Sequence, residues 1–163
     1  MSEYNVYTDG SRIDGQCGAG YSIYKTNIAS NCANLPTTST VFQAEIVGIK
    51  LVCEEIIKMQ DESNINYVKV FSDSQAAVAA LDSSEITSQA VKDAKIALNK
   101  LASNTKHTVL VWIKAPVGHK GNEAADELAK QGTVSETAIK IAIPYCEMKR
   151  LVEEMIRNKW DKN

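Results

Sequence analysis

Residues 67–81 read YVKVFSDSQAAVAAL and join a strand to a helix through one short polar turn. Residues 67–71 are rich in β-branched and aromatic side chains, which is typical of a strand. Residues 75–81 are rich in alanine, which favours a short helix. Because a strand that leads into a helix is the repeating unit of α/β proteins, this stretch predicts that fold class.

The same alternation continues after this stretch. Residues 88–102 carry apolar side chains at helical spacing, and residues 107–113 form a continuous apolar run. Such a run predicts a strand that is covered on both faces. A further helix is predicted from Glu123 to Gln131, with Asn122 as its N-cap and Gly132 at its end.

Antiparallel strands and a long helix are predicted before this stretch. Residues 4–9 and 19–24 have β-type patterns and are separated by a glycine-containing stretch, which indicates a hairpin, and residues 28–34 fit a third short strand. Thr40 is expected to cap a helix that continues to about Met59. Antiparallel strands followed by β–α units predict a mixed α/β sheet flanked by helices.

Composition restricts the class of protein. The chain has 163 residues, of which 44% are hydrophobic and 23% are charged, as in one globular domain. Eighteen basic and twenty acidic residues give a net charge of −2, so any nucleic-acid binding must come from local patches. Four cysteines lack metal-ligand spacing and no apolar leader precedes them. We therefore expect an intracellular protein, nuclear or cytoplasmic and not secreted, with reduced thiols and no membrane span.

The chain is expected to form one domain over residues 1–132, followed by an extension over residues 133–163. The extension carries a regular apolar stripe within residues 145–160. Apolar side chains at this spacing predict an amphipathic helix that packs on an apolar surface, in this case the domain itself or a neighbouring one.

Four acidic residues lie where predicted strands end or helices begin. Asp9 and Asp73 follow strands, Glu45 lies in the first turn of the long helix, and Asp126 lies near the start of the last helix of the domain. Each residue alone is also explained by turn, capping or solvation chemistry. Carboxylates that cluster at strand ends would repel one another without hard cations between them, so the four together predict a Mg²⁺ site. Two such ions about 3.5–4 Å apart are a known device for cleaving phosphodiesters.

Taken in order, these motifs make residues 5–132 similar to the ribonuclease H family, most closely the domains of non-LTR retrotransposon polyproteins. The motifs are Tyr7-Thr8-Asp9-Gly10-Ser11, Phe42-Gln43-Ala44-Glu45, Phe71-Ser72-Asp73-Ser74-Gln75 and Gly121-Asn122-Glu123-Ala124-Ala125-Asp126-Glu127-Leu128-Ala129-Lys130. The resemblance implies a five-stranded mixed sheet of order 3-2-1-4-5 with flanking helices. It also implies an endonuclease that cuts the RNA strand of RNA/DNA hybrids, leaves 5′-phosphate ends, and uses two Mg²⁺ ions for which Mn²⁺ can substitute.

The resemblance assigns roles to matching residues. Asp9 is expected to bridge both ions, Glu45 and Asp73 to complete the ion on the leaving-group side, and Asp126 to hold the ion that activates water. Substrate contacts are expected from four further residues: Ser11, Gln43, Ser74 and Asn122. The implied partners are an RNA/DNA hybrid and an adjoining reverse-transcriptase domain.

The chain departs from the family pattern at three places. Pro116 stands where the family has an active-site histidine, which leaves His119 as a candidate replacement or as an ordinary surface residue. Val41 and Phe42 replace the amides that read 2′-hydroxyl groups. The basic helix and loop that hold the DNA strand are missing, so weak hybrid binding is expected.

Two alternatives remain. One is a catalytically weak or silent binding module of the same fold. The other is a related exonuclease with Asp-x-Glu on its first strand, where this chain has Asp9-Gly10-Ser11.

Overall fold

The fold is built on one five-stranded mixed sheet. The computed structural model describes residues 2–24, 29–61, 63–114, 118–143 and 145–160. The strands are β1 (Ser2–Ile13), β2 (Gln16–Tyr24), β3 (Ser30–Leu35), β4 (Ile65–Ser72) and β5 (His107–Trp112), and they lie in the order β3-β2-β1-β4-β5. The pairs β1–β2 and β2–β3 are antiparallel, whereas β1–β4 and β4–β5 are parallel. The sheet expected from the sequence is confirmed.

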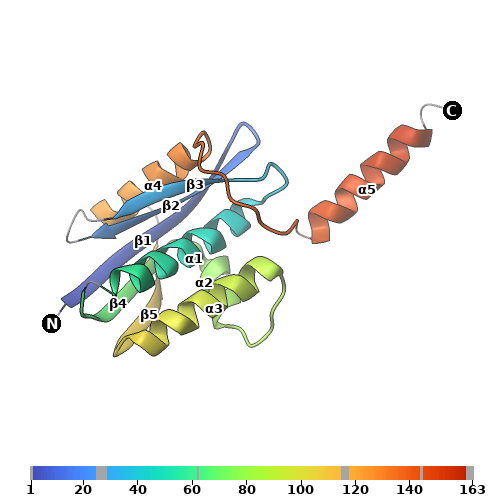
Figure 1. The fold of residues 1–163 in the computed structure, drawn as a ribbon. Coiled ribbons are helices and arrows are strands. Elements are labelled where there is room, and N and C mark those ends of the chain that lie inside the picture. The colour runs from blue at the N-terminus through green and yellow to red at the C-terminus, as the bar shows by residue number, and fades with distance from the viewer. Residues whose placement is uncertain (1, 25–28, 62, 115–117, 144, 161–163) are drawn as a thin grey trace.

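Helices cover the two faces of the sheet unequally. Helices α1 (Val41–Met59), α2 (Gln75–Asp82) and α3 (Gln89–Asn104) lie on one face, and α4 (Lys120–Gly132) lies against β1, β2 and β3 on the other (Figure 1). The main core lies between the sheet and the first three helices. Its largest fully buried side chains are Val6, Ile46, Ile49, Val52, Ile56, Val68, Val70, Val91 and Leu101.

Helix α1 begins where the sequence predicts. The Thr40 side chain accepts a hydrogen bond from the Gln43 backbone N–H at 3.1 Å, and the Gln43 side chain accepts one from the Thr40 backbone N–H at 3.2 Å. This reciprocal capping box satisfies two backbone donors that the first turn leaves free. It therefore sets the start of the helix, and with it the position of Glu45 in the second turn rather than the predicted first.

Two further predictions are corrected by the structure. Strand β5 is an edge strand with no buried residue, because α4 does not reach across to it. The prediction that helices cover both faces of this strand, made from the continuous apolar run of residues 107–113, is therefore wrong. Helix α4 begins at Lys120, with His119 at the N-cap position and no side-chain cap, so Asn122 lies inside the first turn and is not a cap.

The extension after Gly132 has two parts that behave differently. Residues 133–143 continue the domain: Ile139 and Ile141 pack on a second core cluster that includes Leu35 and Val47, and Asn34 forms a parallel bridge with Ala138. The boundary expected at residue 132 therefore does not separate this segment from the core.

Helix α5 (Tyr145–Trp160) has no buried residue and stands away from the sheet and its helices (Figure 1). This position differs from the packed helix expected from the sequence. The chain leaves the domain along β3 and α1 before the helix begins, and the apolar stripe of α5 finds no cover there. None of the described helices is both long and apolar enough to span a membrane.

Candidate metal centre

Three carboxylates meet at one edge of the sheet. Strands β1 and β4 are parallel neighbours that pair Thr8 with Ser72, so Asp9 and Asp73, one residue further on each chain segment, emerge side by side. Glu45 approaches from α1. One carboxylate oxygen from each of these three residues lies within 4.8 Å of the other two. Residues far apart in the sequence are thus brought together by the parallel pairing and by the packing of α1.

Gly10 allows α1 to come this close. A Cβ atom at this position would lie 2.5 Å from the Glu45 backbone nitrogen and 2.8 Å from the Ala44 carbonyl carbon. Only hydrogen fits in this space, so any larger residue would push α1 away from β1. The Gly10 N–H also donates a hydrogen bond to Asp9 Oδ1 at 2.8 Å, which orients that carboxylate.

Burial and mutual repulsion alter the acidity of the three groups. Asp9 and Glu45 are 6% and 7% exposed. Burial, followed by the neighbouring Asp73 charge, raises the pKa of Asp9. Burial, followed by the charges of Asp9 and Asp73, raises the pKa of Glu45. Burial also raises the pKa of Asp73, although a hydrogen bond from Asn122 opposes that shift. All three pKa values are raised, which is the direction expected for buried carboxylates that have no cation beside them.

The donor set fits a hard divalent cation. Glu45 Oε2 is buried and has no hydrogen-bond partner, which is costly for a carboxylate oxygen. Mg²⁺ binds carboxylate oxygens and would remove both the unsatisfied acceptor and the repulsion. Asp9, Glu45 and Asp73 are therefore the residues that would hold such an ion.

Asp126 lies at the rim of this group. Its side chain on α4 is 46% exposed and accepts a hydrogen bond from Lys130 Nζ at 2.7 Å. A hydrogen-bond contact with Asp126 also contributes to the raised pKa of Asp9. The structure therefore places the fourth predicted carboxylate next to the cluster but gives it a cationic partner, which the other three lack among the described residues.

His119 is exposed and lies close to an aromatic group. Its ring centroid is 6.3 Å from that of Tyr7, which in turn stacks on Phe71 at 4.8 Å with an interplanar angle of 17°. Gly121 lies against the Tyr7 ring so closely that a Cβ there would overlap it. This contact places the start of α4, and therefore His119, next to β1. Pro116 lies outside the described residues.

The side chains predicted to contact substrate differ in how free they are to do so. Gln43 is 3% exposed, and its amide is used by Thr40 and by the Ala142 carbonyl, to which Nε2 donates at 3.1 Å. A direct contact from Gln43 to substrate would break these bonds, so the structure does not support that assignment. Ser74 caps α2 through the Ala77 N–H at 3.2 Å and remains half-buried, and Ser11 is half-buried at the end of β1 next to Gly10.

Two contacts to Asp73 were not predicted. Asn122 donates a side-chain hydrogen bond to the Asp73 carboxylate, and its own Oδ1 is buried without a partner. Trp112 Nε1 donates to the Asp73 carbonyl at 3.2 Å. The sequence did contain a signal for the contact between Asn122 and Asp73. Asn122 and Asp126 are four residues apart, and residues at this spacing lie on one face of a helix, so Asn122 could be expected to face the carboxylates together with Asp126.

Fold and site together define an α/β protein of the ribonuclease H-like class, with an acidic cluster of metal-binding type where β1 and β4 emerge. A family model described as RNase H matches residues 1–134, so the chain belongs to the RNase H family. No curated protein sequence matches it significantly.

Solved structures share the fold at low sequence identity. RNase H1 from the archaeon Halobacterium salinarum is 16% identical with a TM-score of 0.63, covering 80% of this chain and 97% of that one. The N-terminal RNase H domain of a Mycobacterium tuberculosis protein is 15% identical with a TM-score of 0.64, covering 82% and 95%. LC11-RNase H1, isolated from compost, is 20% identical with a TM-score of 0.63, covering 82% and 97%.

Proposed function

We propose that this protein is an endonuclease that hydrolyses the RNA strand of RNA/DNA hybrids and leaves 5′-phosphate ends, using two Mg²⁺ ions. The observation that carries the proposal is the buried triad of Asp9, Glu45 and Asp73 with its unsatisfied Glu45 oxygen. Membership in the RNase H family points to the substrate class. When bound, the ions would activate water and stabilise the leaving oxygen.

The residues of the chain would supply orientation and charge. Asp9, Glu45, Asp73 and Asp126 would hold the ions, and Mn²⁺ is expected to substitute for Mg²⁺. The Gly10 N–H fixes one oxygen of Asp9, and Asn122 holds the Asp73 carboxylate. Holding ligands in place before metal or substrate arrives lowers the reorganisation needed for the reaction.

A cleavage assay with three end-labelled duplexes tests the proposal. RNA/DNA hybrid, double-stranded RNA and double-stranded DNA are each incubated with Mg²⁺, Mn²⁺ or excess EDTA. We expect cleavage of the hybrid alone, only with metal, and with 5′-phosphate products. Asp73→Asn should remove it, whereas the matched control Asp82→Asn, at an exposed position on α2, should retain it. Cleavage that survives in EDTA would contradict the mechanism.

One observation supports a second candidate, a catalytically weak or silent binding module. Lys130 forms an ion pair with Asp126 in this structure, and this pairing would lower the affinity of Asp126 for the metal ion that it is expected to hold. The two candidates differ in one measurement: Lys130→Gln should raise the cleavage rate at low Mg²⁺ if the ion pair limits metal binding. A module without catalysis would show no cleavage, whether lysine or glutamine stands at position 130.

We further propose that the domain belongs to a reverse-transcriptase polyprotein. The four motifs at the strand and helix ends support this, through their similarity to the domains of non-LTR retrotransposons. Reading the coding sequence upstream of residue 1 tests the idea directly. A reading frame continuous with polymerase motifs would support it, and a stop codon directly upstream would contradict it.

A further inference from the structure

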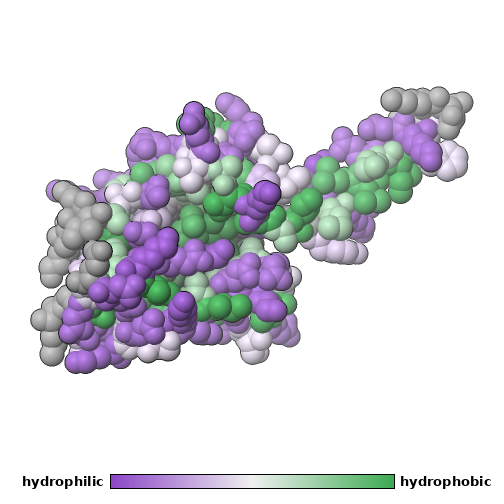
Figure 2. Space-filling model, in the orientation of Figure 1, coloured by the Kyte–Doolittle hydropathy of each residue, from purple (hydrophilic) through white to green (hydrophobic). Residues whose placement is uncertain are grey.

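The two tryptophans of the chain lie in different surroundings. Trp160 is 76% exposed on α5, where Figure 2 shows hydrophobic residues gathered along the helix, beyond the body of the domain. Trp112 is the last residue of β5 and is 45% exposed. Its Nε1–H donates a hydrogen bond to the Asp73 backbone carbonyl at 3.2 Å. An indole at the edge of the sheet thus binds the backbone of a residue of the metal centre.

The three clustered carboxylates differ in how their backbones are fixed. Asp9 lies within β1 and pairs with Gly20 of β2, and Glu45 lies within α1. Asp73 follows the last residue of β4 and precedes the N-cap of α2, so it belongs to neither element. The position of Asp73 therefore depends on bonds made within and around this turn.

The Asp73 carbonyl lies between two hydrogen-bond ladders. The β4–β5 pairing ends where the Ile113 N–H donates to the Ser72 carbonyl at 2.9 Å, and the α2 ladder begins at the Ser74 carbonyl. Trp112 lies opposite Ser72 in the parallel register, and its side chain binds the carbonyl between the two ladders. The Trp112 indole thus extends the link between β4 and β5 by one residue, as far as Asp73.

Asp73 is consequently held at two points. Asn122 donates to its carboxylate, and Trp112 donates to its carbonyl. One Asp73 carboxylate oxygen lies within 4.8 Å of an oxygen of Asp9 and of Glu45, so a small rotation of the Asp73 backbone would change the spacing of the whole cluster. Groups that orient metal ligands without touching the metal typically contribute about 10–100-fold to metal affinity.

We propose that Trp112 is a positioning residue of the metal centre: its indole N–H fixes the Asp73 backbone and so places the Asp73 carboxylate beside Asp9 and Glu45. The inference rests on the proposed function, because it takes Asp73 as a ligand of Mg²⁺. Trp112 acts through Asp73 and does not itself bind the ion.

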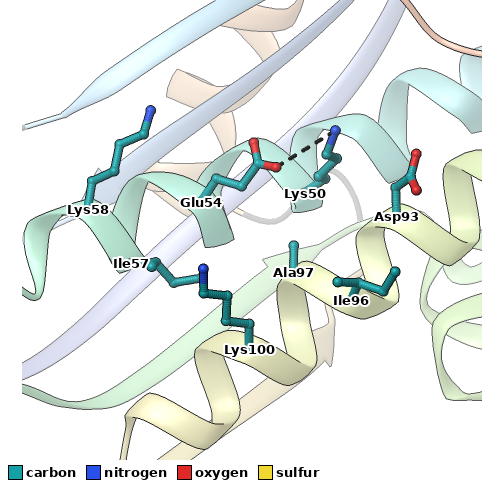
Figure 3. A pocket seen from close by; sticks show the side chains of 8 residues that line it. All are labelled: Lys50, Glu54, Ile57, Lys58, Asp93, Ile96, Ala97 and Lys100. Atoms are coloured by element: carbon teal, nitrogen blue, oxygen red, sulfur yellow. Dashed lines mark ion pairs between the residues drawn. The ribbon is translucent and has the colours of Figure 1, made fainter.

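The surroundings of the Trp112 ring are mainly apolar. Trp112 lines a cavity of about 510 Å³ with Gln75, Asp82 and five apolar residues, namely Val78, Ala79, Leu81, Leu98 and Leu110. The cavity of about 590 Å³ between α1 and α3 is different, because five charged residues line it, among them the paired Lys50 and Glu54 (Figure 3). Phenylalanine could keep the apolar contacts of the Trp112 ring, whereas only the indole supplies the N–H.

Calorimetric titration of Mg²⁺ into the full chain, without nucleic acid, tests the proposal. Trp112→Phe keeps a ring and removes the N–H, so the Kd for Mg²⁺ should rise by about tenfold. The matched control Trp160→Phe makes the same change on α5 and should leave the Kd unchanged. Val78→Ala removes part of the apolar wall and keeps the hydrogen bond, so it should lower the Tm in EDTA without changing the Kd. An unchanged Kd in Trp112→Phe, or an equal rise in Val78→Ala, would overturn the proposal.

Hydrogen exchange of the two indole groups provides a readout that needs no metal. Each phenylalanine variant assigns one indole N–H signal in the NMR spectrum by removing it. In the metal-free wild type, the Trp112 N–H should exchange at least about tenfold more slowly than the exposed Trp160 N–H. Mg²⁺ should slow the Trp112 exchange further, because coupling between two sites is reciprocal. Equal exchange rates for the two indoles would overturn the proposal.

The outcomes separate the role of Trp112 from the proposed nuclease activity. Hybrid cleavage by the wild type, together with an unchanged Mg²⁺ affinity in Trp112→Phe, would reject the positioning role and keep the nuclease. A wild type that loses Mg²⁺ affinity on Trp112→Phe but cleaves no hybrid would keep the positioning role and reject the nuclease. A wild type that binds no Mg²⁺ would overturn both.

Discussion

At the scale of single residues, Asp9 is the centre of the site. Its carboxylate is buried, oriented by Gly10 and repelled by Asp73, whereas a hydrogen bond with Glu45 lowers the pKa of Asp9. The raised pKa values of Asp9 and Glu45 mean that the folded protein without metal binds more protons than the unfolded chain. Their contribution to stability is therefore complete below the ordinary carboxyl pKa of about 4 and is lost as the pH rises through the raised values.

We expect Asp9→Asn to abolish metal-dependent cleavage and to flatten this pH dependence. In EDTA, the wild type should lose free energy of unfolding between pH 5 and pH 8, whereas the variant should lose less and be about 1–2 kcal/mol more stable at pH 8. Urea unfolding at the two pH values measures both. Equal slopes for the two proteins would show that Asp9 does not carry the repulsion.

His119 provides a second prediction at this scale. If its imidazole acts in turnover, only the protonated form donates to a leaving oxygen or attracts a phosphate. His119→Ala should then slow hybrid cleavage more at pH 6 than at pH 8. Equal rates for the variant and the wild type across this range would assign His119 to the surface, where its contact with the Tyr7 ring would be its main role.

At the scale of elements, the distance between α1 and β1 determines whether a site exists. Gly10→Ala should destabilise the protein by about 1–3 kcal/mol, because its Cβ meets α1 backbone at 2.5 Å, and it should weaken the Mg²⁺-induced rise in Tm. Gly48→Ala is a graded control. Its Cβ lies 3.2 Å from the Asp9 carbonyl oxygen, and its gain in helix propensity of about 1 kcal/mol offsets the crowding.

Thermal melts with and without Mg²⁺ measure both changes. We expect near-normal stability for Gly48→Ala and a clear loss for Gly10→Ala. Equal effects of the two substitutions would mean that the close approach of α1 at Gly10 is not what positions Glu45.

At the scale of the whole molecule, the extension divides into a part that stabilises the fold and a part that does not. A chain that ends after Ile143 should keep its free energy of unfolding within about 0.5 kcal/mol at low protein concentration, because no residue of α5 is buried. A chain that ends after Val134 should lose about 2–3 kcal/mol, since Ile139 and Ile141 leave the second core cluster.

Both truncated chains should still cleave hybrid in the presence of metal. Urea unfolding of the two proteins side by side tests the division. A large loss of stability on removing α5 alone would show that the helix packs on its own domain in solution.

The sequence by itself determined the elements, their order and the identity of the acidic residues. Thr40, Ser74 and Ser88 cap the helices that local pattern predicts, because capping bonds and helical periodicity act within a few residues. Asp9, Glu45 and Asp73 could be selected in advance because strand ends and helix starts are readable locally and the motifs match a known family.

Only the tertiary structure decided which surfaces are covered and how the selected residues meet. The apolar run of β5 became an exposed edge, the Gln43 amide was bound by the Ala142 carbonyl, and Asp126 was placed beside Asp9 at the rim of the cluster. Asn122 became a partner of Asp73, and the stripe of α5 stayed uncovered on its own chain. Each of these outcomes depends on contacts between segments far apart in the sequence, and the periodicity of one segment carries no information about which other segment will pack on it.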